Sequence, residues 1–377
     1  MEWRLIMIAK KHTDTIFSKD LVQSLSKMGW TSSLQTHMND FYGGNRLPAR
    51  VVGVNKNSFC VSQGETEFLA TVSGRLTRQA DCQYPVVGDW VIISDTVIYA
   101  VLPRKNALSR GASGSRGKQK PLPRREQVIA ANLDAVFIVC GLDRDFNIRR
   151  IERYVTLVYN CGLNPVIILT KADLHPDPGK FISEVEPVSI GVPVHMVSAK
   201  DSIGLVQLEK YLSPGQTITM IGSSGSGKST LVNRLYGKTV QATGPVSESV
   251  GKGKHTTTSR DLIMMPQGGL VIDNPGIREI AFWDCDGGIG LTFPEIENLA
   301  SECRFSDCSH MHEPGCRVIK AVTEGEIVQE RLESFHKMKR ELMYLSDRQH
   351  KSANRVEKER WKEVALKIKD IKKGRHN

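Results

Sequence analysis

The 377-residue sequence predicts a multidomain α/β protein, with a small N-terminal β-barrel, a central doubly wound α/β domain and a C-terminal helical domain. A chain of this length exceeds what one hydrophobic core usually organises. Short β-branched runs early in the chain give way to alternating apolar runs and helical stretches, and a cysteine cluster follows near residue 310. We divide the chain into an N-terminal extension (1–35), a barrel (36–106), a basic linker (107–126), the central domain (127–285) and the C-terminal domain (286–377).

Hydropathy gives no sign of a membrane protein. The sequence holds no run of about 18 apolar residues. Residues 1–8 are too short and too poorly flanked to form a signal peptide. We therefore expect a soluble, cytoplasmic monomer that does not bind membranes.

The formal net charge of +10 is concentrated in two segments. Residues 101–125 hold 8 Lys or Arg and no acidic residue, and residues 331–377 hold 15 Lys or Arg against 7 Asp or Glu. A basic stripe is the electrostatic footprint expected for a nucleic-acid backbone, but it is also typical of a solvated helical face or a flexible tail. Charge alone therefore leaves both interpretations open.

The region after residue 49 has the texture of a small barrel. Short β-branched and aromatic runs alternate with turn residues there, and an OB-fold is the leading candidate. A loop rich in Gly, Ser, Arg and Pro, from Ser109 to Pro123, follows as a linker or mobile arm. The predicted strands are 50–54, 58–62, 67–72, 89–93 and 97–102.

The central region alternates short apolar runs with helical stretches. Such runs are typical of a parallel sheet buried on both faces, and the helices between them complete a doubly wound α/β domain. The predicted strands are 135–139, 165–169, 192–197, 218–221 and 269–273, and the predicted helices are 148–160, 204–212 and 229–235.

A glycine-rich loop, Gly222-Ser-Ser-Gly-Ser-Gly-Lys228-Ser229, stands between a predicted strand and a predicted helix. In this motif the backbone N–H groups and the helix N-terminus bind nucleotide phosphates, the lysine reaches the β- and γ-phosphates, and the serine is a ligand of Mg²⁺. The expected contacts are Gly222, Ser223, Ser224, Gly225, Ser226, Gly227, Lys228, Ser229 and Thr230.

Other segments decide between ATP and GTP. A transporter-type ATPase should carry a Leu-Ser-Gly-Gly-Gln signature and a strand ending in Asp-Glu, and the sequence has neither. The strand ending at Asp273 continues instead as Asn-Pro-Gly276. This places a carboxylate near the water shell of Mg²⁺ and a glycine N–H where a γ-phosphate is sensed.

Two further segments have the character of guanine-reading loops. In Thr170-Lys171-Ala172-Asp173 the carboxylate can accept from guanine N1–H and the exocyclic amine, and the Lys171 stem can lie across the ring. Thr170 stands where most GTPases have Asn, so an amide contact is lost and base specificity rests more on Asp173. In Ser198-Ala199-Lys200 a backbone N–H is expected to meet guanine O6.

Both base-reading segments precede the phosphate loop, whereas the usual GTPase order places them after it. The sequence therefore predicts a circularly permuted P-loop GTPase domain.

The segment Gly251–Thr258 lies between the phosphate loop and Asp273, where a GTPase keeps a threonine that closes on Mg²⁺. We assign Thr257, together with Ser229, as a ligand of Mg²⁺, but the sequence does not decide between Thr257 and Thr256. The residue after Gly276 is Ile277, which cannot orient an attacking water by hydrogen bonding, so backbone, a partner macromolecule or His255 must do so. His255 is equally consistent with a solvated loop residue. We expect slow intrinsic turnover that a partner accelerates, and the predicted catalytic residues are Lys228, Asp273, Gly276 and His255.

Three cysteines and a histidine are spaced as Cys303-x4-Cys308-x-His310-x5-Cys316. This composition predicts one structural Zn²⁺ per chain, because four protein ligands close the tetrahedron and leave no position for substrate. His312 competes with His310 as the fourth ligand. The remaining cysteines are expected to be reduced, mostly buried thiols: Cys60, Cys82, Cys140, Cys161 and Cys285.

Taken together, these motifs resemble the ribosome small-subunit-dependent GTPases, bacterial circularly permuted enzymes that assist late maturation of the small ribosomal subunit. The resemblance covers about residues 30 to 345 and rests on residues 87–90, 125–134, 252–258 and 303–316. It implies an OB-fold, a permuted GTPase domain and a zinc-bearing helical domain, with zinc on the four residues above. The sequence departs from the pattern of this family at Thr170, where asparagine is common, and at Asn274, where threonine or serine is frequent. Residues 1–20 have no counterpart in the family.

The function expected from the residues and the resemblance is GTP hydrolysis, with Mg²⁺, by a protein that binds the small ribosomal subunit and its rRNA and is stimulated by it. One alternative is an RNA-binding assembly or checkpoint factor in which hydrolysis to GDP only triggers release. A second alternative, an ATP-driven transport subunit, is disfavoured by the missing signature.

Overall fold

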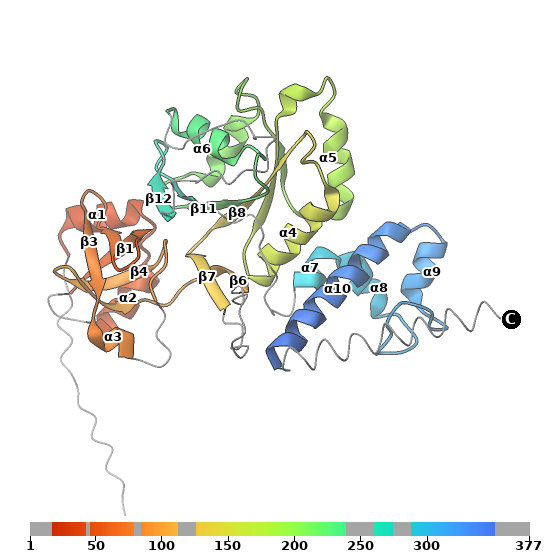
Figure 1. Cartoon of the computed structure of the whole chain (residues 1–377), viewed down its shortest axis with the longest axis horizontal. Coiled ribbons are helices and arrows are strands. Elements are labelled where there is room, and N and C mark those ends of the chain that lie inside the picture. The colour runs from red at the N-terminus through yellow and green to blue at the C-terminus, as the bar shows by residue number, and fades with distance from the viewer. Residues whose placement is uncertain are drawn as a thin grey trace, which may run out of the picture.

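The computed structural model describes residues 17–42, 46–78, 84–111, 126–238, 260–273 and 288–350. Figure 1 shows three parts in the order of the chain: a barrel, a central sheet flanked by helices, and a group of helices at the C-terminal side. Among the residues described, no helix is both long and apolar enough to cross a membrane.

Two short helices precede the barrel. The first, α1, begins after Ser18, whose hydroxyl accepts a hydrogen bond from the N–H of Leu21 at 3.2 Å as an N-cap. Trp30, which follows α1, packs edge-on against Trp90 of the barrel with 4.8 Å between ring centroids. The bounds of the helices are α1 (Lys19–Lys27) and α2 (Ser32–Tyr42).

A five-stranded barrel follows, and the five strands expected from the sequence are confirmed. Its strands are paired in the order β1-β2-β3-β5-β4, and antiparallel pairing of β4 with β1 closes the ring. Apolar side chains fill the interior, including Val51, Val61 and Ile98. The bounds are β1 (Leu47–Val54), β2 (Phe59–Ser62), β3 (Glu67–Val72), α3 (Gly74–Arg78), β4 (Trp90–Ser94) and β5 (Val97–Val101).

The segment predicted as a linker contains regular structure at both ends. β6 (Ala107–Gly111) pairs antiparallel with β7 (Glu126–Ala131) in a separate two-stranded sheet. The middle of the predicted arm, residues 112–125, lies outside the described residues.

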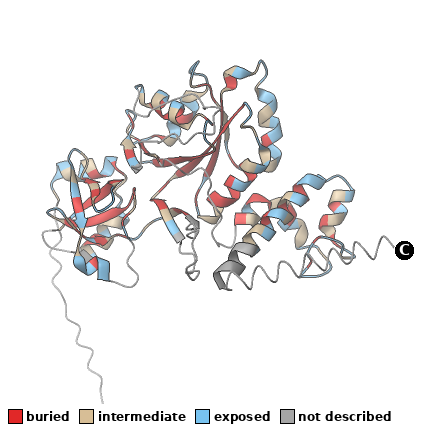
Figure 2. Cartoon of the chain, in the orientation of Figure 1, coloured by how far each residue is buried: buried red, intermediate tan, exposed pale blue. Residues whose placement is uncertain are grey.

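The central sheet has the strand order β10-β9-β8-β11-β13-β12. Neighbouring strands are parallel except β12, which runs antiparallel to β13. The inner strands are buried from end to end, as Figure 2 shows in red, because helices cover the sheet. The bounds are β8 (Ala135–Gly141), β9 (Pro165–Thr170), β10 (Val194–Met196), β11 (Thr217–Ile221), β12 (Arg260–Met264) and β13 (Leu270–Asp273).

The flanking helices follow the prediction with one difference: residues 204–212 form a 3₁₀ helix instead of an α-helix. A 3₁₀ segment of this kind suits a short connection between two parallel strands. The bounds are α4 (Ile148–Asn160), η1 (Ala172–Leu174), α5 (Gly179–Val185), η2 (Glu186–Val188), η3 (Leu205–Tyr211) and α6 (Lys228–Tyr236).

β1 also joins the barrel to the central sheet. Its last residues, Gly53 and Val54, pair with Asp261 and Arg260 of β12, so that one continuous 11-stranded sheet runs through both parts.

Of the C-terminal helices, α7 packs on α4, and α10 contacts both α7 and α4, as Figure 1 shows. Phe293 and Phe335 are fully buried there, with ring centroids 5.6 Å apart. The bounds are α7 (Gly288–Thr292), α8 (Pro294–Ala300), α9 (Arg317–Thr323) and α10 (Gln329–His350).

Candidate functional site

The phosphate loop connects the carboxyl end of β11 to the first turn of α6, as predicted. Three of its glycines have positive φ angles: Gly222 (151°), Gly225 (81°) and Gly227 (96°). A Cβ on Gly222 would lie 2.2 Å from the Val139 carbonyl oxygen. Only glycine therefore allows the loop to turn this closely over the end of β8.

Lys228 folds back over the loop that precedes it. Its Nζ donates to the carbonyl oxygens of Gly222 (2.8 Å) and Ser223 (2.6 Å) and lies 3.3 Å from Ser226 Oγ. The ammonium group is thus held at the mouth of the loop and beside the N-terminus of α6. Both features favour a bound polyphosphate.

The segment predicted to read the base also holds the phosphate loop. Thr170 is buried at the end of β9, and its Oγ1 donates to the Ser226 carbonyl oxygen at 2.6 Å. Lys171, in the left-handed conformation with a φ of 62°, donates from Nζ to the Gly225 carbonyl oxygen at 2.6 Å. The structure therefore gives the Thr170 hydroxyl a contact with the loop backbone, which the sequence did not predict.

Asp173 and Ser198 come together at the other end of the site. Ser198 is buried, and its Oγ donates to Asp173 Oδ1 at 2.7 Å. The Ser198 N–H is bonded to the Ile203 carbonyl oxygen at 3.0 Å. The N–H groups of Ala199 and Lys200 are therefore the candidates for guanine O6.

The loop after β8 adds two carboxylates that the sequence reasoning missed. Asp143 Oδ2 lies 2.6 Å from Lys171 Nζ. Partial burial opposes ionisation of Asp143, but this hydrogen bond with Lys171 outweighs it and lowers the pKa of the carboxyl. Asp145 accepts a hydrogen bond from the hydroxyl of Ser223 in the phosphate loop. The signal available in the sequence was an Asp-x-Asp directly after a buried strand, at the edge where the phosphate loop lies.

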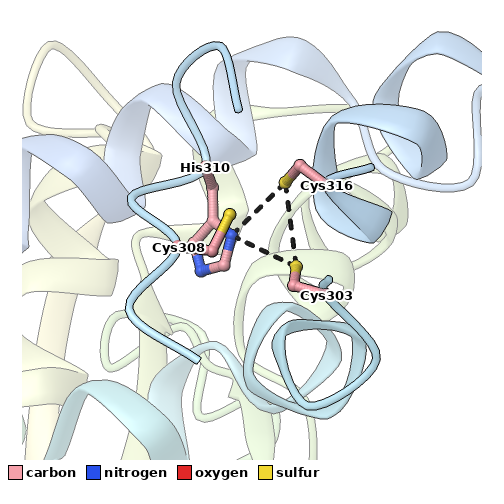
Figure 3. A group of neighbouring side chains, drawn as sticks. All are labelled: Cys303, Cys308, His310 and Cys316. Atoms are coloured by element: carbon pink, nitrogen blue, oxygen red, sulfur yellow. Dashed lines mark hydrogen bonds between the residues drawn. The ribbon is translucent and has the colours of Figure 1, made fainter. Parts of the chain in front are cut away.

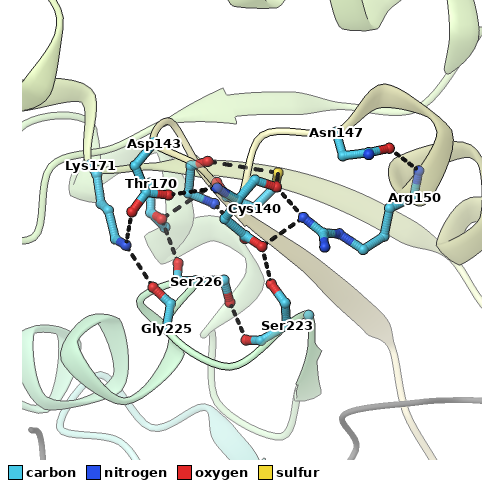
Figure 4. A network of polar contacts seen from close by, with 12 residues as sticks. Cys140, Asp143, Asn147, Arg150, Thr170, Lys171, Ser223, Gly225 and Ser226 are labelled. Carbon is cyan, nitrogen blue, oxygen red and sulfur yellow. Dashed lines mark hydrogen bonds and ion pairs between the residues drawn. The ribbon is translucent and has the colours of Figure 1, made fainter. Parts of the chain in front are cut away.

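Cys140, at the end of β8, belongs to the same polar network, which Figure 4 shows around the phosphate loop. Burial raises the pKa of its thiol to about 11, and its Sγ lies 3.5 Å from the Asp145 carbonyl oxygen. The group is therefore a neutral donor at physiological pH, in keeping with the reduced, buried thiol expected there. Two other cysteines with the same expectation, Cys60 and Cys161, are half-buried.

Cys303, Cys308, His310 and Cys316 form a compact cluster (Figure 3). One ligand atom from each residue lies within 4.8 Å of the others. His310 Nδ1 is 3.7 Å from Cys303 Sγ and 3.5 Å from Cys316 Sγ, and the two sulfurs are 3.8 Å apart. Tetrahedral Zn²⁺ with ordinary bond lengths needs about 3.8 Å between sulfurs and about 3.6 Å between sulfur and nitrogen. The cluster has the dimensions of such a site.

The surroundings of Cys316 suit an anionic sulfur ligand, and those of His310 suit a neutral imidazole. Cys316 is the N-cap of α9, and its Sγ accepts from the N–H of Ile319 at 3.4 Å. Burial lowers the pKa of His310, which keeps the ring neutral. His310 belongs to this group of ligand atoms, whereas His312, the alternative that the sequence left open, is exposed and lies outside the group.

The sequence model of the RsgA GTPase family matches residues 101–283. Small ribosomal subunit biogenesis GTPase RsgA of Methanosarcina acetivorans is 42% identical over 351 residues, covering 92% of both chains. The protein of the same name from Opitutus terrae is 41% identical over 90% of this chain and 96% of its own. This chain belongs to the RsgA GTPase family.

Solved structures agree with the membership in the RsgA family. The crystal structure of YjeQ from Thermotoga maritima has a TM-score of 0.58 and 30% sequence identity, and covers 79% of this chain and 99% of its own. The structure of YloQ, described as a circularly permuted GTPase, has a TM-score of 0.56 at 23% identity, with 82% and 98% of the chains covered. The central fold is thus that of a circularly permuted GTPase, as the motif order predicted.

Some residues predicted for the site of this RsgA family member fall outside the described residues: His255, Thr256, Thr257 and Gly276. Asp273 is described and ends β13, half-buried, two strands from β8 in the sheet. Ser229 and Thr230 lie in the first turn of α6, and Ser224 is exposed in the loop.

Proposed function

We propose that this protein hydrolyses GTP and acts, as a monomer in the cytoplasm, in late maturation of the small ribosomal subunit, which stimulates its activity. One observation carries the proposal: the predicted base-reading segment, residues 170–173, is hydrogen-bonded both to the phosphate loop and to Ser198. Thr170 and Lys171, at the end of β9, hold the phosphate loop, and Asp173, three residues after Thr170, pairs with Ser198, which follows β10. A nucleotide with guanine at one end and phosphates at the other fits this arrangement.

The roles of the site residues follow from their chemistry. Lys228 offsets charge on the β- and γ-phosphates, and backbone N–H groups of the loop bind the phosphate oxygens. Ser229 and Asp273, with Thr257, would hold Mg²⁺, which stabilises the charge that develops on the phosphates. Gly276 would sense the γ-phosphate by its N–H, and His255 would orient the attacking water. Because Ile277 offers no hydrogen bond to that water, intrinsic turnover should be slow.

The cluster of three cysteines and His310 is proposed to hold one Zn²⁺ with a structural role. The dimensions given above support it, as does the closed set of four protein ligands, which leaves no position for a substrate. The barrel is proposed to be an OB-fold, supported by the strand order 1-2-3-5-4 with closure on β1 and by the helix between β3 and β4.

The small ribosomal subunit is the proposed partner, because the curated relatives carry its biogenesis in their names. Contact with its rRNA is supported by the charge of residues 101–125 and 331–377 and by the barrel. A checkpoint factor that uses hydrolysis only for release is the second candidate, and the same basic segments favour it.

Phosphate release with GTP and with ATP, at equal concentration and with or without small ribosomal subunits, tests the proposal. We expect GTP to be turned over faster and the subunits to accelerate it. ATP turnover that equals GTP turnover would contradict the guanine assignment, and a rate insensitive to subunits would contradict the partner assignment.

Two variants separate catalysis from binding. Lys228→Ala should abolish most nucleotide affinity while the circular dichroism of the protein stays unchanged. Asp273→Ala should stop hydrolysis, and maturation of subunits in cells that carry only this variant would favour the checkpoint role over the enzymatic one.

A further inference from the structure

The loop between β8 and α4, residues 142–147, touches the phosphate loop through a carboxylate that has no role in the chemistry above. Asp145 Oδ1 accepts a hydrogen bond from the hydroxyl of Ser223, the second residue of the phosphate loop. The Ser223 hydroxyl is thereby directed toward the loop that follows β8.

Asp145 is itself held from two sides. Arg150, in the first turn of α4, donates from a terminal nitrogen to Asp145 Oδ1 at 2.6 Å and also to the Asp145 carbonyl oxygen. The N–H of Gly141 donates to Oδ2 at 3.1 Å. The carboxylate is 12% exposed, so the pairing with Arg150 also balances a negative charge that would otherwise lie close to a polyphosphate. The Asp145 carboxylate is therefore held in one orientation as a hydrogen-bond acceptor, and Arg150 offsets its charge.

The phosphate loop is held from outside at three of its six residues between β11 and α6. Thr170 holds the carbonyl of Ser226, Lys171 holds that of Gly225, and Asp145 holds the side chain of Ser223. Figure 4 shows Ser223, Gly225 and Ser226 facing these strand ends. The loop is rich in glycine, and a free loop of that composition would lose much conformational entropy when it closes on phosphates. External hydrogen bonds reduce that loss by fixing the shape beforehand.

We propose that Asp145 is a positioning residue, which keeps the phosphate loop in its nucleotide-binding shape through Ser223, with Arg150 orienting its carboxylate. The proposal rests on the proposed function only in that the loop binds the phosphates of a guanine nucleotide. It adds a contact that the predicted set of site residues did not contain.

Dissociation constants for GDP and GMP, measured by competition against a fluorescent GDP derivative, test it. Asp145→Ala and Ser223→Ala should each weaken GDP binding roughly tenfold, the order expected for a lost hydrogen bond to a charged group. GMP makes fewer contacts with the loop, so its affinity should fall by only about twofold at the same loss of loop order. The preference for GDP over GMP should therefore shrink, whereas partial unfolding would weaken both ligands equally.

Further variants complete the test. The double variant should bind GDP no more weakly than Asp145→Ala alone, because both changes remove the same contact. Asp145→Asn, which keeps an oxygen acceptor for Ser223, should fall between the wild type and Asp145→Ala. Arg144→Ala, an exposed charge removed from the same loop, is the matched control and should bind GDP as the wild type does.

The outcomes separate the two claims. A wild-type protein that binds neither nucleotide would overturn the proposed function itself. A wild type that binds GDP, with additive effects of the two alanine variants or an unchanged ratio of GDP to GMP affinity, would overturn the role of Asp145.

Discussion

At the scale of single residues, the nucleotide site depends on side chains that hold the loop as much as on those that meet the ligand. Thr170 illustrates this. The sequence showed a threonine where GTPases commonly have asparagine, and from that we expected a lost contact. In the structure the Thr170 hydroxyl donates to the Ser226 carbonyl oxygen, so the side chain stabilises the phosphate loop, while the expected loss of an amide contact stays a prediction.

Thr170→Val keeps the shape of this side chain and removes the hydroxyl. The Ser226 carbonyl would then be buried with one partner fewer, which costs about 1 to 2 kcal/mol and raises the dissociation constant for GDP roughly tenfold. The preference for GTP over ATP should stay unchanged, because Asp173 is untouched. Titration calorimetry with GDP, GTP and ATP measures both quantities, and a change of base preference with little loss of GDP affinity would contradict this assignment.

Residues whose roles follow from local spacing could be predicted from the sequence. The phosphate loop and the four-residue metal cluster are of this kind, because each is defined within a short stretch of chain. Asp143 and Asp145 could not be predicted in the same way. Their contacts depend on how residues 141–147 curve toward a loop about eighty residues later, and only the parallel pairing of β8 with β11 sets that approach.

At the scale of elements, α4 connects the central domain to the C-terminal helices through a buried ion pair. Arg331 of α10 is 4% exposed and lies 2.6 Å from Glu152, which is fully buried in α4. The guanidinium also contacts Glu295 at 2.7 Å, donates to the Thr292 carbonyl oxygen at 2.6 Å and lies 4.1 Å from the centre of the Phe293 ring. This pair could not be predicted from the sequence, because Glu152 and Arg331 are far apart in the chain.

Arg331→Met should lower the free energy of unfolding by about 3 kcal/mol, since it leaves the Glu152 carboxylate buried without its main partner. The double variant with Glu152→Met should regain part of that loss, because the fully buried carboxylate is removed together with its partner, whereas Glu295, the second partner of Arg331, keeps its charge. Urea unfolding followed by circular dichroism measures both. Lys320→Met is the control: it breaks an exposed pair with Glu324 at 3.7 Å and should change stability by less than about 0.5 kcal/mol. Equal losses of unfolding free energy for Arg331→Met and for the control would show that the buried pair contributes no more to stability than the exposed one.

At the scale of the whole molecule, the five-stranded barrel and the permuted GTPase fold could be predicted from the sequence, because each has its own pattern of apolar residues, while the exact division of the chain into domains stays a prediction. The joining of the first two through β1 and β12 could not. The sequence of an edge strand does not indicate which strand of another domain it will pair with.

One zinc per chain is expected from elemental analysis of protein purified without chelators. Cys308→Ala should lose the metal and lower the melting temperature, because zinc binding contributes directly to folding of the C-terminal part. Cys60→Ala should change neither property, as Cys60 lies in β2 of the barrel. Metal-free wild-type protein, or a Cys308→Ala variant that keeps its metal, would remove the zinc assignment.

Affinity for the small subunit should depend steeply on salt, because neutralised phosphates release counterions. If about six phosphates are engaged, affinity should fall on the order of a thousandfold between 50 and 200 mM salt. Deletion of residues 350–377 should flatten that dependence and leave intrinsic GTP hydrolysis unchanged. An unaltered salt dependence would identify the charge of this segment as a solvated surface.

The order of the central strands along the chain also determines a sequence of events during synthesis. Chains emerge from the amino end, and domains fold as units in that order. The barrel strands and then β8, β9 and β10 are therefore available before β11 supplies the phosphate loop, and β12, the partner of β1, and β13 follow after it. Stalled nascent chains exposed only as far as Tyr211 should protect the barrel from protease yet retain no GDP, whereas chains exposed past β13 should retain it. The strands that carry the predicted base-reading residues are thus made before the phosphate loop. In an unpermuted GTPase the phosphate loop is made first.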